Sequence, residues 1–272
     1  MHTPPIPDDP FALVEHPPLA AAGEAEVRVF GAPARMLALP QRRQRRGIPD
    51  RRRPVFQECR AEAIIRTEAV WRAPGMALTG NAFPFAARQL VLWATERRRE
   101  PTHEMLAVAC TVCDVAPASA MVNSMGAAGS ITRSHVHLVA DVEPFLDSLP
   151  CSGIAPAAVH LTDAQAAGCT LLQLDPPFPA VAVGIRGPAA ARAAAMHHLL
   201  ECRTTPSFNL VGVPGTLWLL PRAVETPAPH FDQALGGAEL WGRWCFNDTD
   251  AFSRATSDDL EAALAHACCP RA

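Results

Sequence analysis

The same order of strand-like and helix-like segments occurs twice in this chain of 272 residues, and that repeat limits the fold more than any other feature. The first copy has strand-like segments at 61–66, 76–79 and 89–93, a helical segment at 102–115, and strand-like segments at 119–124 and 134–140. The second copy has strand-like segments at 170–174 and 181–183, an alanine-rich helix at 188–202, and strand-like segments at 208–213 and 216–220. The sequence therefore predicts an α+β fold of two tandem half-barrel repeats, each an antiparallel sheet with helices.

The composition changes at both ends of this repeated region. The predicted organisation is a Pro-rich N-terminal arm at 1–25, a domain at 26–250 with repeats at about 55–145 and about 160–225, and a C-terminal helix at 251–272. The helix is predicted because Ser257 is a suitable N-terminal residue and because Leu260 and Leu264 share one helical face.

Charge and composition exclude several classes of function. The formal net charge is −3, whereas general nucleic-acid binders are usually basic, so no nucleic-acid partner is expected. All 24 basic residues are arginine, and the absence of lysine excludes Schiff-base chemistry and the lysine of a P-loop. Any phosphate group must then be held by arginine, histidine or backbone N–H groups.

The cysteines and the chain's apolar runs bear on its location. Nine cysteines in no regular framework favour a reducing compartment and free thiols. Cys110 and Cys113 form a C-x-x-C pair in an apolar helical segment with no second pair, so neither a metal nor a redox role is predicted for them. No signal-peptide pattern is present, and no apolar run reaches the ~18 residues of a membrane span. We expect a cytoplasmic protein without a membrane partner.

Two histidines follow a turn of small residues. Within the stretch 123–139, the turn 126–130 precedes His135 and His137 in a segment with strand character. Residues two apart on a strand point to the same face, so both imidazoles are expected to project together. Glycine in the turn lets backbone N–H groups approach a phosphate, and a neutral imidazole beside that phosphate can attack phosphorus in line. A metal site on the same pair is the alternative, and it lacks further ligands nearby in the sequence.

One dense run of charge precedes the first repeat. Seven of the thirteen residues at 41–53 are arginine. Such runs usually form a solvated face or loop.

Four segments make the chain similar to a known family. They are Asn-Ala-Phe-Pro-Phe at 81–85 with the strand after it, the 123–137 segment with its two histidines, Asn209-Leu210 with Leu-Leu-Pro-Arg at 219–222, and Gly-Gly-Ala-Glu-Leu-Trp-Gly at 236–242. In order and spacing they resemble the histidine-triad superfamily, in the branch that contains galactose-1-phosphate uridylyltransferase, diadenosine tetraphosphate phosphorylase and the GDP-hexose phosphorylases. The resemblance implies a HIT-like fold whose second repeat is degenerate, because that repeat has no His-x-His.

The resemblance also implies a reaction. The protein would be a nucleotidyltransferase or phosphorylase acting on an NDP-sugar or a dinucleotide. His137 would attack the α-phosphorus to form a nucleotidyl-histidine, which phosphate or a sugar phosphate would then discharge, while His135 would orient the site. The expected nucleotide- and phosphate-binding residues are Asn81, Asn123, Gly126, Gly129, Ser130, Thr132, Arg133 and Arg222, with Arg42 and Arg46 as further phosphate contacts. No metal ligands and no firm cofactor are implied, and the protein would be a monomer or homodimer.

The chain departs from the family two residues after His137. Val139 stands where the transferases and phosphorylases have glutamine and the hydrolases have a third histidine. Valine donates no hydrogen bond to a phosphate oxygen, and losing one preorganised donor can cost ~10²–10³ in rate. Thr132, Arg133 or an arginine from 41–53 would have to take its place. The alternatives are therefore a nucleotide hydrolase of the same family and a nucleotide-binding protein with impaired catalysis.

Overall fold

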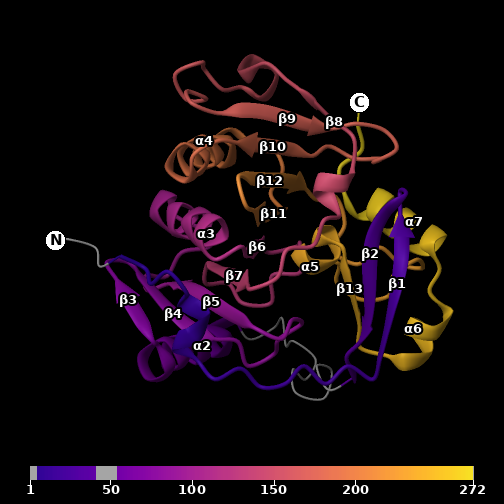
Figure 1. The fold of residues 1–272 in the computed structure, drawn as a ribbon, viewed down its shortest axis with the longest axis horizontal. Helices are drawn as coiled ribbons and strands as arrows, with labels where there is room; N and C mark the ends of the chain where they lie inside the picture. Colours follow the sequence, from indigo (N-terminus) through magenta and orange to yellow (C-terminus); the bar gives the residue numbers. More distant parts are fainter. Residues whose placement is uncertain (1–4, 41–53, 272) are drawn as a thin grey trace.

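A single ten-stranded antiparallel sheet runs through the molecule and carries both repeats (Figure 1). The structure is a computed structural model that describes residues 5–40 and 54–271, with side chains described from residue 60 in the second range. The strand order is β3-β4-β5-β7-β6-β11-β12-β10-β9-β8. The arginines of the run at 41–53, including Arg42 and Arg46, lie outside the described residues.

The two halves of the sheet contain the same elements in the same order. The first half consists of β3 (Trp71–Ala73), β4 (Met76–Gly80), β5 (Gln89–Ala94), α3 (His103–Val115), β6 (Ser119–Asn123) and β7 (His135–Val139). The second half consists of β8 (Cys151–Gly153), β9 (Thr170–Leu174), β10 (Val183–Arg186), α4 (Ala189–Cys202), β11 (Phe208–Val213) and β12 (Thr216–Pro221). The halves join where β6 pairs with β11, with Asn123 opposite Asn209. The α+β fold of two tandem repeats predicted from the sequence is confirmed.

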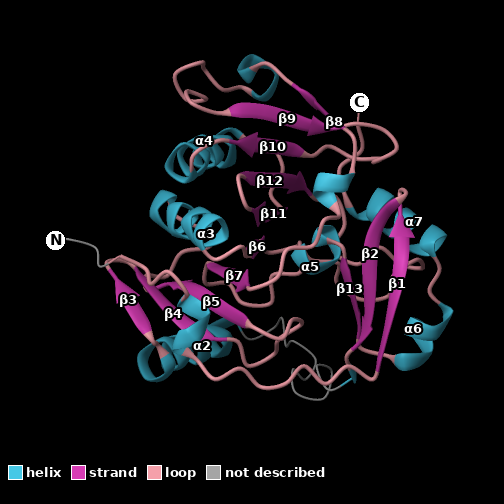
Figure 2. Cartoon of the chain, in the orientation of Figure 1, coloured by secondary structure: helices cyan, strands magenta, loops and turns pink. Residues whose placement is uncertain are grey.

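Helices α3 and α4 pack side by side on one face of the sheet (Figure 2). Alternate strand residues turn toward them, such as Leu90, Val136 and Leu210, and these form one large core cluster with the helices. The intervening residues, Gln89, His135 and His137 among them, therefore project from the opposite face.

Two separate groups of elements cover that opposite face. A three-stranded sheet of β1 (Gly23–Val29), β2 (Ala32–Ala38) and β13 (Arg243–Phe246) packs there with α5 (Gly237–Trp241), α6 (Thr249–Arg254) and α7 (Ser257–Ala267) (Figure 1). These elements share a core cluster with Val139 and Met121 of the large sheet. Helix α2 (Pro54–Glu68) covers β4 and β5 in a smaller cluster that contains Trp93. His137 lies on the strand between these two clusters.

The segment 61–66, expected to be a strand, is part of α2, so that expectation was wrong. Ala61 and Ile65 are one helical turn apart, and both are buried against Val91 and Trp93. The spacing of four residues between buried side chains fits a helix, and an apolar segment this short does not separate the two structures by pattern alone. The short elements α5 and β13 were also not expected.

The N-terminal segment docks on the body through one aromatic side chain. The 3₁₀ turn Pro10–Leu13 is capped by Asp9 and buries Phe11 to 1% exposure. Asp9 also pairs with Arg88 at 3.0 Å. Two further 3₁₀ turns, Leu146–Ser148 and Pro156–Val159, lie between the repeats. Across 5–40 and 54–271, no helix has both the length and the apolar character that crossing a bilayer requires.

The second repeat has no His-x-His, and the position equivalent to His137 is occupied by a tryptophan. Strands β11 and β12 are joined by the tight turn at Pro214-Gly215, where the first repeat has a long loop. Trp218 lies opposite Gly184 on β10, as His137 lies opposite Val91 on β5. Trp218 is 1% exposed, and a Cβ on Gly184 would stand 2.8 Å from Cζ3 of its ring. The degenerate second repeat expected from the sequence is therefore a packed site.

This packing predicts that Gly184→Ala destabilises the protein. The added methyl group has no room beside the Trp218 ring, and overpacking of this kind costs about 1–3 kcal/mol. Urea unfolding should show the loss as a lower midpoint at unchanged slope. Gly153→Ala is the matched control, because its Cβ would meet nothing closer than 3.9 Å. Equal midpoints for the two variants would contradict the prediction, because they would show that the Trp218 ring moves aside without a cost in stability.

Candidate active site

Strand β7 brings His135 and His137 together, as the i, i+2 spacing predicted. Their ring centroids are 5.1 Å apart and the ring planes meet at 84°. His135 is buried at 7% exposure and stacks at a tilt on Trp93, with 4.9 Å between centroids. His137 is half-buried, and its ring forms an edge-type contact with the Phe85 ring, with 6.1 Å between the centroids. Of the two imidazoles, His137 is the more accessible.

The protonation of His135 is set by a backbone carbonyl. Its Nδ1 lies 2.9 Å from the carbonyl oxygen of Arg133. A carbonyl oxygen only accepts hydrogen bonds, so Nδ1 of His135 carries a proton. The ring orientation is fixed by the same bond. His135 therefore acts as a rigid, buried neighbour of His137.

One hydrogen-bond partner of His137 is Gln89, which the sequence did not single out as a site residue. Gln89 lies on β5, is 1% exposed, and stands opposite Val139 in the β5–β7 pairing. Its Nε2 lies 3.2 Å from Nδ1 of His137, and its Oε1 accepts a hydrogen bond from the backbone N–H of Phe85 at 3.0 Å. The only available signal was the strand register, because Gln89 and His137 are 48 residues apart in the chain.

The turn before β7 depends on glycine at two positions. Gly126 has φ +81°, and a Cβ there would lie 2.5 Å from Oγ of Ser207. A Cβ on Gly129 would lie 2.6 Å from the carbonyl oxygen of Ser124. The N–H of Gly129 donates to that same carbonyl at 3.1 Å, so it is used within the turn. Ser130 and Thr132 are half-buried and lead into β7.

Asn123 and Arg222 belong to a buried network at the junction of the repeats. Oδ1 of Asn123 accepts hydrogen bonds from Nδ2 of Asn209 at 2.8 Å and from the N–H of Gly237 at 2.7 Å. Arg222 is 3% exposed and donates to Oδ1 of Asn209 at 2.6 Å. Its other donors reach the carbonyl oxygens of Ala267, Leu235 and Val224. Burial lowers the pKa of the Arg222 guanidinium. The structure thus connects these two residues to the fold rather than to His137.

Arg133 and Asn81 also have protein partners. Arg133 is 3% exposed and donates to the carbonyl oxygens of Ala94 at 3.2 Å and Thr95 at 2.6 Å. Its Nη2 pairs with Glu62 of α2 at 3.1 Å. Asn81 follows β4, and its Oδ1 accepts a hydrogen bond from the N–H of Phe83 at 3.0 Å. Of the predicted site residues, His135, His137, Ser130 and Thr132 share one segment, and Asn81 stands beside Gln89 through a backbone bond of 3.2 Å.

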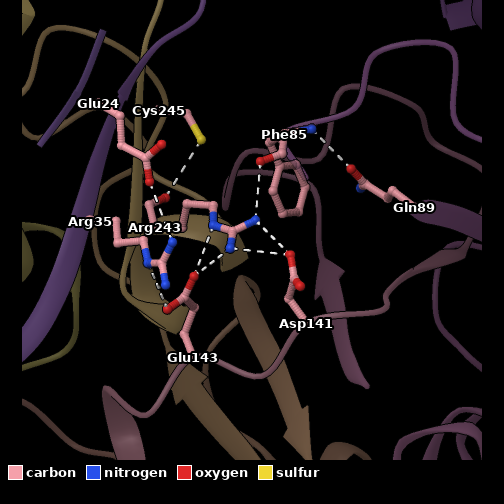
Figure 3. A network of polar contacts seen from close by, with 8 residues as sticks. All are labelled: Glu24, Arg35, Phe85, Gln89, Asp141, Glu143, Arg243 and Cys245. Carbon is pink, nitrogen blue, oxygen red and sulfur yellow. Dashed lines mark hydrogen bonds and ion pairs between the residues drawn. The ribbon is translucent and has the colours of Figure 1, made fainter. Parts of the chain in front are cut away.

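A charged network centred on the buried Arg243 and Glu143 holds the loop after β7 (Figure 3). Arg243 pairs with Glu143 and with Asp141, the latter at 3.3 Å, and its guanidinium lies 4.7 Å from the Trp241 ring centroid. Nη1 of Arg243 also reaches the carbonyl oxygen of Phe85 at 3.5 Å. Phe85 is therefore held from two sides, by Arg243 at its carbonyl and by Gln89 at its N–H.

The cysteine pair and possible metal ligands are further candidate functional groups. Burial raises the pKa of the Cys110 thiol and raises that of Cys113 further, so both stay protonated at neutral pH. In the part of the chain that the structure describes, His, Cys, Asp and Glu side chains do not form a group of three or more that could hold a metal ion.

Comparison with known proteins supports the fold. No protein-family model matches the sequence, and no curated protein matches it. Yeast Ap4A phosphorylase Apa2 in complex with Ap4A matches in structure with a TM-score of 0.70 and 14% identity, covering 94% of this chain and 92% of that chain. A further crystal structure of yeast Ap4A phosphorylase Apa2 matches with a TM-score of 0.64 and 15% identity, covering 93% of this chain and 92% of that chain. An ADP-glucose phosphorylase from Arabidopsis thaliana matches with a TM-score of 0.42 and 10% identity, covering 89% and 98%.

Identities this low show the fold alone. The match to the yeast enzyme extends over both repeats and nearly the whole of each chain. It agrees with the four sequence segments that resemble the histidine-triad superfamily. The chain therefore shares the fold of yeast Ap4A phosphorylase Apa2 over nearly its whole length.

Proposed function

We propose that this protein is a nucleotidyltransferase or phosphorylase that cleaves an NDP-sugar or a dinucleotide through a nucleotidyl group on His137. The observation that carries the proposal is the placement of His137. It is a half-buried imidazole on the strand between two core clusters, beside a turn of small residues. Gln89 holds Nδ1, so Nε2 is the ring nitrogen on the far side from the buried amide.

The reaction has two displacements at one phosphorus. Once the ring proton has moved to Nδ1, the lone pair of Nε2 attacks the α-phosphorus, an N–P bond forms, and the bond from that phosphorus to the bridging oxygen breaks. The leaving phosphate ester departs with the electron pair of that bond. A phosphate or sugar phosphate then attacks the same phosphorus, and the N–P bond breaks with its electron pair returning to Nε2. Each displacement needs an in-line nucleophile and fixed donors for the phosphoryl oxygens.

The surroundings supply part of that set of donors. Ser130 and Thr132 lie on the segment that enters β7, and the turn before them is built on two close approaches that only glycine permits. The ring of His135, whose orientation is fixed by its hydrogen bond to the carbonyl oxygen of Arg133, lies beside the ring of His137. The yeast proteins of the same fold are described as Ap4A phosphorylase with bound Ap4A and with bound AMP, which supports a nucleotide as the small-molecule substrate here.

A second candidate, a nucleotide-binding protein without turnover, is favoured by one observation. Val139 is fully buried in the core cluster formed with the C-terminal elements. It projects from the same face as His137, and its side chain has no group that could hydrogen-bond a phosphate oxygen.

Intact mass spectrometry separates these candidates. The pure protein is incubated with NDP-sugars, dinucleotides and NTPs in the absence of acceptor. An acid-labile nucleotidyl adduct that is absent from His137→Ala supports the covalent mechanism, and faster discharge by phosphate than by water supports the phosphorylase over the hydrolase. Nucleotide binding by calorimetry with neither adduct nor turnover would support the binding protein instead.

A further inference from the structure

We propose that Gln89 is a positioning residue that holds neutral His137 with its ring proton on Nε2. For its effect on the reaction, this inference rests on the proposed function of His137. Gln89 faces Val139 across the β5–β7 pair and shares a sheet face with His137. An amide therefore stands beside the imidazole from the neighbouring strand, in a position where only 1% of the glutamine is exposed.

The backbone of Phe85 decides which way the Gln89 amide points. The oxygen and nitrogen of an amide differ only in whether they accept or donate, so the hydrogen-bond partners must assign them. Oε1 lies 3.0 Å from the N–H of Phe85, which can only donate. The reversed amide would set its own N–H₂ against that N–H, two buried donors facing each other. The oxygen therefore faces Phe85, and the N–H₂ group faces His137.

This orientation selects one protonation form of the His137 ring. The Gln89 N–H₂ donates toward Nδ1 at 3.2 Å, so Nδ1 offers its lone pair. A neutral imidazole carries one proton, which then stays on Nε2. His135 has the opposite arrangement, because the carbonyl of Arg133 requires a proton on its Nδ1. The two histidines of one strand thus hold their protons on different ring nitrogens.

The consequence falls on the first displacement. Nε2 attacks phosphorus only when its lone pair is free, so the ring proton must first move from Nε2 to Nδ1. One net hydrogen bond of this kind gives roughly a fivefold bias between the two forms. Glutamate at position 89 would reverse the bias, since a carboxylate accepts from both the Phe85 N–H and Nδ1–H of His137.

Nuclear magnetic resonance of the full chain with ¹⁵N-labelled histidine tests this directly. At a pH where imidazoles are neutral, two-bond correlations show which nitrogen of His137 carries the proton. We expect Nε2 to carry it by roughly fivefold or more in the wild type, Nδ1 to carry it in Gln89→Glu, and the bias to fall in Gln89→Leu. Gln173→Glu, an exposed glutamine-to-glutamate change on β9, should leave the pattern unchanged.

The rate of adduct formation is the second measurement. Gln89→Glu should form the nucleotidyl adduct roughly five times faster than the wild type, because most rings then present the Nε2 lone pair. A proton on Nδ1 in the wild type, or an unchanged bias in Gln89→Leu, would overturn the inference. The resonance measurement needs no substrate. Hence an Nε2 proton without any adduct would support the role of Gln89 while contradicting the covalent mechanism.

Discussion

His137→Ala is expected to lower turnover of the phosphoanhydride substrate by about 10⁴-fold or more. The variant lacks the group that we place in line with the α-phosphorus. The adjacent imidazole of His135 is not expected to replace it, because His135 is buried, bonded to the carbonyl oxygen of Arg133 and stacked on Trp93. Steady-state kinetics with the substrate identified by the adduct screen measures the loss. Nucleotide affinity should change by only a few-fold, since most of the binding contacts remain.

The fold should tolerate this change. Removing a half-buried ring leaves the Gln89 N–H₂ without its imidazole acceptor, which costs about 1–3 kcal/mol in the free energy of unfolding. His198→Ala is the matched control, because His198 lies on α4 with 38% of its side chain exposed, on the face of the sheet away from β7's histidines. Full turnover by His137→Ala would contradict the mechanism, and equal losses in both variants would point to instability.

The sequence predicted the fold well because its evidence is local. Apolar strand segments, one apolar helix in each half and a glycine-containing turn are each visible over a few residues. His135 and His137 needed only the alternation of side chains along one strand to be placed together. The error at 61–66 arose because Ala61 and Ile65 suit either structure until the sheet beneath them is known.

The candidate site was predicted less completely because its support comes from other strands. Gln89 meets His137 only through the register of β5 on β7. Asn123 has a side chain of the kind expected to bind a nucleotide, yet its side-chain oxygen Oδ1 already accepts hydrogen bonds from Asn209 and Gly237. These hydrogen bonds come from segments more than 80 residues away in the chain, so a local sequence pattern cannot predict them.

Arg222→Leu is expected to destabilise the protein by about 3 kcal/mol, the range for breaking a buried hydrogen-bond network. The guanidinium donates four hydrogen bonds, to Asn209 Oδ1 and to the carbonyl oxygens of Ala267, Leu235 and Val224. It thereby joins the end of β12 to the C-terminal helix and orients the amide that binds Asn123. Leucine fills part of the volume and replaces none of these donors.

Chemical denaturation separates this role from phosphate binding. A structural Arg222 predicts a lower unfolding midpoint in Arg222→Leu, with the KM of the folded protein changed little at low temperature. If Arg222 instead bound a phosphate group of the substrate, Arg222→Leu would raise KM and leave the stability unchanged. Arg254→Leu on the exposed side of α6 controls for the loss of one positive charge. Because all four hydrogen bonds of Arg222 go to the protein interior, we expect the loss of stability to be the larger effect. A change in KM alone, at unchanged stability, would show instead that Arg222 contacts the substrate.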